Sequence, residues 1–73
     1  MSHDKLIRMA NQIAGFFETQ PIADKPGAVA AHLRDFWDPR MRAELDAIVA
    51  EGGTGLSPLA LDAAQRLGQT APA

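Results

Sequence analysis

Residues 32–42 read His-Leu-Arg-Asp-Phe-Trp-Asp-Pro-Arg-Met-Arg, and this stretch decides the fold. Asp38 followed by Pro39 is typical of a helix start, because an N-cap carboxylate accepts hydrogen bonds from free amides and proline fits the first helical position. The residues before Trp37 have the spacing of a helix that ends there. The stretch therefore predicts two helices that meet at a tight corner, with the pair Phe36 and Trp37 fixed beside it.

Apolar spacing predicts a helix on each side of this corner. Upstream, Asp24 and Pro26 are suited to open a helix. Its apolar residues recur at i, i+4, i+7 and i+8, the pattern of one helix face, and they are Val29, Leu33, Phe36 and Trp37. Downstream, a helix opens at Pro39 and runs to about residue 50, where Gly52 and Gly53 favour a left-handed cap. Its apolar stripe consists of Met41, Leu45, Ile48 and Val49.

Residues 4–18 are rich in helix formers and predict the first helix, which Pro21 ends and which Ser2 or Asp4 could cap. Its apolar positions cover about half of the circumference, whereas a surface helix needs a stripe of only about 100°. They are Leu6, Ile7, Met9, Ala10, Ile13, Ala14, Phe16 and Phe17. Two explanations stay open: the helix packs on its own domain and on a partner, or two neighbouring helices of the domain flank it.

Ser57 and Pro58 repeat the N-cap and proline pattern and predict a fourth helix to about Leu67, which Gly68 would end. Its apolar face is rich in alanine. We therefore expect an all-α fold, a small bundle of three to four short helices. Residues 1–68 would form a single domain, and residues 69–73 would form a disordered tail.

Length and composition limit the function classes. The chain has 73 residues, no cysteine and a formal net charge of −2. Disulfides and thiolate metal sites are excluded, and so small a core usually needs additional support, here from another protein chain. The negative charge argues against nucleic-acid binding, although a small helical nucleic-acid-binding or regulatory module is the alternative. With neither a signal peptide nor an apolar run of about 20 residues, the expected location is the cytoplasm, with no membrane partner.

Catalytic chemistry finds no support in the sequence. No nucleophile, base and orienting group are spaced for joint action, and no metal-ligand motif such as HExxH occurs. His32 lies beside the apolar stripe, and a lone histidine is more often a partly exposed hydrogen-bonding residue than a ligand or base. We therefore expect no catalytic, cofactor-binding or metal-binding residue in this chain.

Arg40 and Arg42 occupy the first turn of the third predicted helix, where the helix macrodipole disfavours cations by about 0.3–1 kcal/mol each. A partner carboxylate would reverse this cost. The alternative is local pairing of Arg40 with Glu44 and of Arg42 with Asp46, at i,i+4 spacing, which contributes only about 0.2–0.5 kcal/mol.

Trp37 has two possible locations, because spacing alone leaves open whether it contacts a partner or fills the core of the domain.

Three blocks of the sequence resemble a known family. They are residues 6–17, which read Leu-Ile-Arg-Met-Ala-Asn-Gln-Ile-Ala-Gly-Phe-Phe, the corner at residues 32–42, and more weakly residues 52–59, Gly-Gly-Thr-Gly-Leu-Ser-Pro-Leu. The corner block is the most specific, with an aromatic pair, an acidic residue, proline and Arg-Met-Arg. The chain resembles the small delta subunit of soluble, NAD-dependent, molybdenum-containing formate dehydrogenases.

This resemblance implies a non-catalytic accessory subunit in a cytoplasmic complex. The catalytic alpha subunit would carry a molybdenum bis-guanine-dinucleotide cofactor and iron–sulfur clusters, beta would bind FMN and NAD, gamma would carry another cluster, and the delta chain would bind no cofactor. Delta would bind alpha and support assembly, cofactor insertion or stability. Because aromatic residues, Met and Arg are enriched at interfaces, the expected partner-binding residues are Ile7, Phe17, Arg34, Phe36, Trp37, Arg40, Met41 and Arg42.

Overall fold

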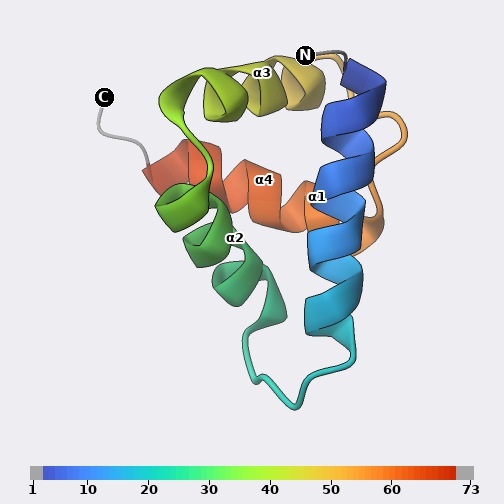
Figure 1. Cartoon of the computed structure of the whole chain (residues 1–73), viewed down its shortest axis with the longest axis vertical. Helices are drawn as coiled ribbons and strands as arrows, with labels where there is room; N and C mark the ends of the chain where they lie inside the picture. Colours follow the sequence, from blue (N-terminus) through green and yellow to red (C-terminus); the bar gives the residue numbers. More distant parts are fainter. Residues whose placement is uncertain (1–2, 71–73) are drawn as a thin grey trace.

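The computed structural model describes residues 3–70, with the side chains of residues 3–68. Four helices follow one another: α1 (His3–Glu18), α2 (Lys25–Phe36), α3 (Pro39–Ala50) and α4 (Pro58–Thr70), as Figure 1 shows. The described residues contain no strand. The predicted all-α bundle is confirmed, with four helices, and α3 has the predicted bounds. Ser2, one of the two candidate caps of α1, lies outside the described residues.

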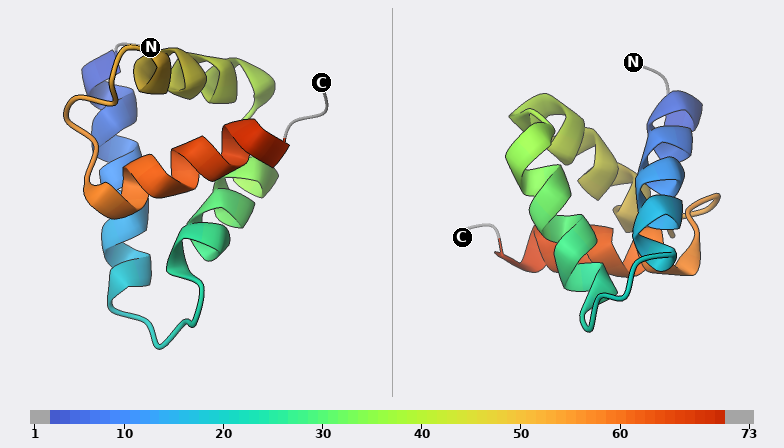
Figure 2. Two further views of the ribbon diagram at one scale, coloured as in Figure 1. Left: turned by 180° about the vertical axis from the view of Figure 1, so that it is seen from behind. Right: turned by 60° about the horizontal axis from the view of Figure 1, so that its bottom comes forward.

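The helices enclose a single core. In Figure 1, α1 and α2 approach each other toward the loop that joins them, α3 crosses above, and α4 crosses behind both; the view from behind in Figure 2 brings α4 to the front. The most extensive helix contact joins α2 and α4, and α1 contacts each of the other three helices. Neighbouring helices therefore account for most of the broad apolar face of α1.

Small residues make up much of this core, which allows the helices to pack closely. Alanines contribute from three helices, α1, α2 and α4, and Trp37 joins them with only 6% of its surface exposed. The predicted alanine-rich face of α4 is confirmed. The buried residues are Leu6, Ala10, Ala14, Val29, Ala30, Leu33, Trp37, Leu45, Ile48, Ala60, Ala63, Ala64 and Leu67. Of the two explanations for Trp37, the structure supports the core.

The two helices that meet at the corner, α2 and α3, both have the predicted N-caps. A carboxylate oxygen of Asp24 accepts from the amide of Gly27 at 3.3 Å, and one of Asp38 accepts from the amide of Met41 at 2.8 Å. The amide of Trp37 donates to the carbonyl of Leu33 at 2.8 Å and closes α2. These bonds pair amides and carbonyls that helix ends otherwise leave free.

The end of α3 is also as predicted, with both glycines in the left-handed half of backbone space. The Gly52 amide donates to Val49 O at 3.0 Å and the Gly53 amide to Ile48 O at 2.9 Å, which is the Schellman arrangement. Gly53 has a φ of +68°, and a Cβ added there would lie 2.5 Å from Leu61 Cδ1. Position 53 therefore requires glycine for its backbone and for its packing against α4.

We expect Gly53→Ala to lower the free energy of unfolding by roughly 1–2 kcal/mol, the cost of a left-handed L-residue, plus the cost of moving Leu61. Gly15→Ala is the matched control, because Gly15 lies in α1 with nothing within 4 Å of the added Cβ. That control should be stabilising by about 0.5–1 kcal/mol. Urea denaturation of both variants measures the difference, and equal stabilities would contradict this account of α3.

The Asn11 side chain hydrogen-bonds α1 to the loop that precedes α4. Its amide nitrogen donates to Gly55 O at 2.9 Å, and its amide oxygen accepts from the Ser57 amide at 2.8 Å. We expect Asn11→Ala to cost about 1–3 kcal/mol, because it leaves the partly buried Ser57 amide without its partner. Thermal unfolding measures this loss, and an Ala variant as stable as the wild type would argue against this role for Asn11.

The C-terminal end of α4 differs from the prediction. Ser57 Oγ accepts from the Ala60 amide at 3.2 Å and caps the helix as expected. The helix nevertheless continues through Gly68 to Thr70, so the predicted end at Leu67 was wrong. Gly68 has no left-handed φ, and a Cβ there would lie 3.3 Å from Asp46 Oδ1. Gly68 thus permits close approach of α4 to α3 instead of ending a helix. Residues 71–73 of the expected tail lie outside the described residues.

Candidate functional site

Four rings from α1 and α2 form one continuous group, which we call the aromatic cluster: Phe16, Phe17, His32 and Phe36. The centroids of Phe16 and Phe17 are 5.6 Å apart with their planes at 84°. Phe17 lies 5.8 Å from His32 at 67°, and His32 lies 4.6 Å from Phe36 at 31°. These separations are those of favourable aromatic pairs. The cluster joins two helices that are separated in sequence by the loop at residues 19–24.

The ends of this cluster are exposed. Phe16 has 63% of its surface accessible and Phe36 has 74%, whereas Phe17 and His32 are half-buried. A hollow of about 300 Å³ lies beside them and is lined by Gln12, Ile13, Phe16, Phe17 and His32. Single exposed apolar residues are ordinary, but a contiguous exposed patch marks an interaction site. The aromatic cluster and its hollow are therefore the best candidate for a partner-binding surface.

Backbone geometry explains why two pairs of adjacent aromatic residues, Phe16 with Phe17 and Phe36 with Trp37, each have one ring against the core and one ring exposed. Consecutive helical residues point about 100° apart, so Phe17 packs against the core while Phe16 turns away from it. At the corner, α2 ends at Phe36, and Trp37 takes an extended backbone as the C-cap. That change of direction places the indole in the core and leaves Phe36 outside.

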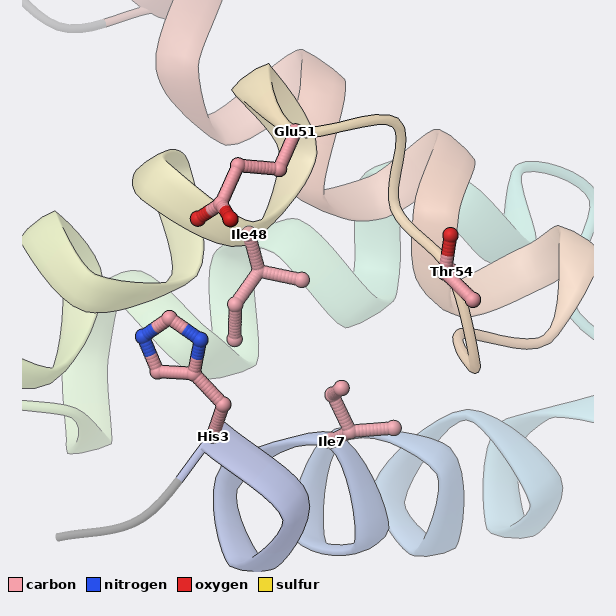
Figure 3. Close-up of a pocket in the computed structure, with 5 residues that line it drawn as sticks. All are labelled: His3, Ile7, Ile48, Glu51 and Thr54. Carbon is pink, nitrogen blue, oxygen red and sulfur yellow. The ribbon is translucent and has the colours of Figure 1, made fainter.

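The structure brings only two of the eight predicted partner-binding residues into this cluster, Phe17 and Phe36. Arg34 is exposed and has no ion pair among the described residues, and Trp37 is in the core. Ile7 lines a second hollow of about 190 Å³, in which His3 and Ile7 of α1 extend toward Ile48 of α3 and toward Glu51, the C-cap of that helix (Figure 3).

Arg40 and Met41 line a third hollow, of about 240 Å³, together with Leu6, Asp38 and Glu44. The predicted residues thus do not form one surface.

The two local arginine pairs that the sequence allowed do not form. Arg66 instead pairs with Asp24 at 3.1 Å and with Asp62 at 3.3 Å. Arg42 is half-buried, and its Nε has neither solvent contact nor a hydrogen-bond partner among the described residues. The two arginines at the start of α3 therefore form no ion pair among the described residues.

Sequence reasoning did not select Phe16 or His32 as partner-binding residues. Phe16 carried a usable signal, because adjacent helical residues point about 100° apart, and two large neighbouring rings then differ in how far they face the core. His32 carried less, since its role depends on Phe17 across the loop. The structure places it among rings, half-buried, and no hydrogen bond of its side chain was found in the described part of the chain.

Neither a metal-ligand group nor a membrane-spanning helix occurs among the described residues. Among residues 3–70, no three His, Cys, Asp or Glu side chains are grouped so that they could hold a metal ion. No described helix is long and apolar enough to cross a membrane. What the exposed rings offer chemically is apolar area for contact with another molecule.

The family model of the NADH-dependent formate dehydrogenase delta subunit, FdsD, matches residues 5–64. The chain belongs to this delta-subunit family. A comparison with curated proteins gave no match. The matched region of the delta subunit begins in α1 and ends within α4, so it includes the whole aromatic cluster and the corner between α2 and α3.

Proposed function

We propose that the chain is a non-catalytic accessory subunit that binds the large catalytic subunit of a cytoplasmic, NAD-dependent, molybdenum-containing formate dehydrogenase. In this proposal the beta and gamma subunits complete the complex. The molybdenum cofactor, the iron–sulfur clusters and FMN belong to the partner subunits, and this chain holds none of them. Its contribution is physical, to support assembly, cofactor insertion or stability of the complex.

The observation that carries this proposal is the exposed aromatic cluster on a member of the delta-subunit family. Phe16 and Phe36 leave large apolar surfaces in water. A chain this small buries only a modest fraction of its surface on folding, so apolar area that stays exposed is a notable loss of stabilisation. Covering each ring is worth about 1.5–3 kcal/mol. Rigid aromatic side chains on helices also lose little conformational entropy when they are covered, which suits them to an interface.

Stabilisation of the complex follows from mass action. A subunit that binds the folded catalytic subunit and not its unfolded chain raises the stability of the folded form in proportion to the logarithm of its concentration over Kd. The same linkage stabilises this chain, whose own core is small. Loss of the delta subunit should therefore lower the amount and thermal stability of the assembled enzyme without changing the reaction that the cofactors perform.

A tagged chain recovered from its native cells tests the function. Mass spectrometry of the co-purified proteins, combined with molybdenum and iron analysis, should find large metal-containing formate dehydrogenase subunits in stoichiometric amounts. A folded chain that is recovered alone would refute the proposal. A nucleic-acid-binding module, the alternative class, would instead retain a labelled duplex in a salt-dependent way.

A further inference from the structure

The third hollow lies at the start of α3 and is bounded by Leu6 of α1, and the aromatic cluster contributes no residue to its lining. Its volume of about 240 Å³ is below the roughly 300–1,000 Å³ of small-molecule sites, so it has room for one side chain. Leu6 is buried and Met41 is half-buried, and these two supply an apolar wall. Asp38, Arg40 and Glu44 supply the polar part of the lining.

Glu44 indicates what kind of group the hollow accepts. Its Oε2 has no solvent contact and no hydrogen-bond partner among the described residues. An ionised carboxylate accepts and cannot donate, so this oxygen requires a donor. The last torsion of glutamate is broad and roughly twofold, and binding would require the Glu44 carboxylate to rotate so that this oxygen meets the arriving group. Asp38 uses one oxygen to cap α3, through the Met41 amide at 2.8 Å.

We propose that this hollow binds a basic side chain, lysine or arginine, of a protein partner. The aliphatic stem would lie along Leu6 and Met41, and the charged head would donate to Glu44 and to the free oxygen of Asp38. Charge complementarity favours this occupant, because two carboxylates outnumber the single guanidinium of Arg40 at the hollow. An acidic side chain would meet two like charges. The aliphatic stems of lysine and arginine are suited to apolar walls with a polar end.

Replacing Arg40 should change the affinity of the hollow for a cation in the opposite direction from replacing Glu44. It lines the hollow but makes no ion pair with Glu44, so its charge acts on an arriving cation as repulsion. Removing the charge of Glu44 should weaken binding of a cation, whereas removing the charge of Arg40 should strengthen it. An anion-binding hollow would respond to both changes in the reverse direction.

The experiment titrates the full chain with Nα-acetyl-lysine-N-methylamide and follows amide shifts by NMR. We expect saturable shifts around Leu6, Met41 and Glu44, and much weaker ones with the neutral probe Nα-acetyl-norleucine-N-methylamide. Glu44→Gln should weaken binding of the cation about tenfold or more, because charged hydrogen bonds are roughly twice as strong as neutral ones. Arg40→Gln should tighten it, and Glu51→Gln, outside this hollow, should leave it unchanged.

Equal binding of the two probes, or a Glu44→Gln chain that binds the cation as the wild type does, would overturn the inference. So would saturable binding of acetate that Arg40→Gln abolishes. Each variant's thermal unfolding is recorded first, so that a folding defect is recognised. The inference rests on the proposed function only in having a protein as the source of the basic group. The small probes test the hollow itself, and their failure would leave recovery of the formate dehydrogenase subunits unaffected.

Discussion

A chain carrying both Phe16→Ser and Phe36→Ser is expected to fold normally and to lose its partner. Both rings lie largely in water, so the isolated chain gives up little packing when they are removed. At an interface each ring would contribute about 1.5–3 kcal/mol. The double variant should therefore bind roughly 100- to 10,000-fold more weakly than the wild type. Co-purification with tagged variants, followed by a Kd measurement on the purified subunits, checks this expectation.

A matched control makes this result specific. Gln65 is exposed on α4 and belongs neither to the rings of the aromatic cluster nor to the lining of its hollow, and Gln65→Ser should leave recovery of the partner unchanged. Thermal unfolding of the double variant should resemble that of the wild type. Undiminished partner recovery by a folded double variant would remove the aromatic cluster as the binding surface, while leaving the family membership intact.

Replacing the neighbouring aromatic residue has the opposite consequence, because Trp37→Ala is expected to unfold the isolated chain. Trp37 is 6% exposed and lies in the core. Deleting a buried tryptophan side chain costs about 3–5 kcal/mol, and a core of this size supplies about 3–5 kcal/mol in total. The variant should lack the cooperative thermal transition of the wild type, measured by circular dichroism.

Phe36→Ala is the control for this substitution, since it removes an aromatic ring one residue away that is 74% exposed. That variant should keep its helical spectrum and its transition. A Trp37→Ala chain that unfolds cooperatively at the wild-type temperature would contradict the assignment of Trp37 to the core. It would also return Trp37 to the partner-binding surface, where its spacing in the sequence equally allowed it.

Local chemistry made most of the fold predictable. Each of the last three helices opens with an acidic or hydroxyl N-cap followed closely by proline, and such caps act within one turn, so the sequence states them directly. The Gly-Gly end of α3 is equally local, because a left-handed cap strongly favours glycine. Gly68 resembles the same signal but does not end a helix. Its role depends on the distance between α3 and α4, which no local pattern contains.

The candidate site depended more on assembly in three dimensions. Spacing placed Phe36 and Trp37 together on one stripe, but the end of α2 separates them into surface and core. The broad apolar face of α1 was visible in the sequence, yet its covering by three helices was not. His32 acquires its ring contacts only because α1 and α2 lie together. Partner-binding residues were therefore predicted by type, and their grouping required the structure.

Photo-crosslinking from the aromatic cluster in living cells tests the central claim most directly. A benzophenone amino acid replaces Phe36 in the tagged chain, and a second strain carries it at Gln65 on α4. Irradiation should join position 36, and not position 65, to the large catalytic subunit of formate dehydrogenase, identified by mass spectrometry of the adduct. A chain that is crosslinked to that subunit from position 65 alone, or that is folded and crosslinked to nothing from position 36, would contradict the account.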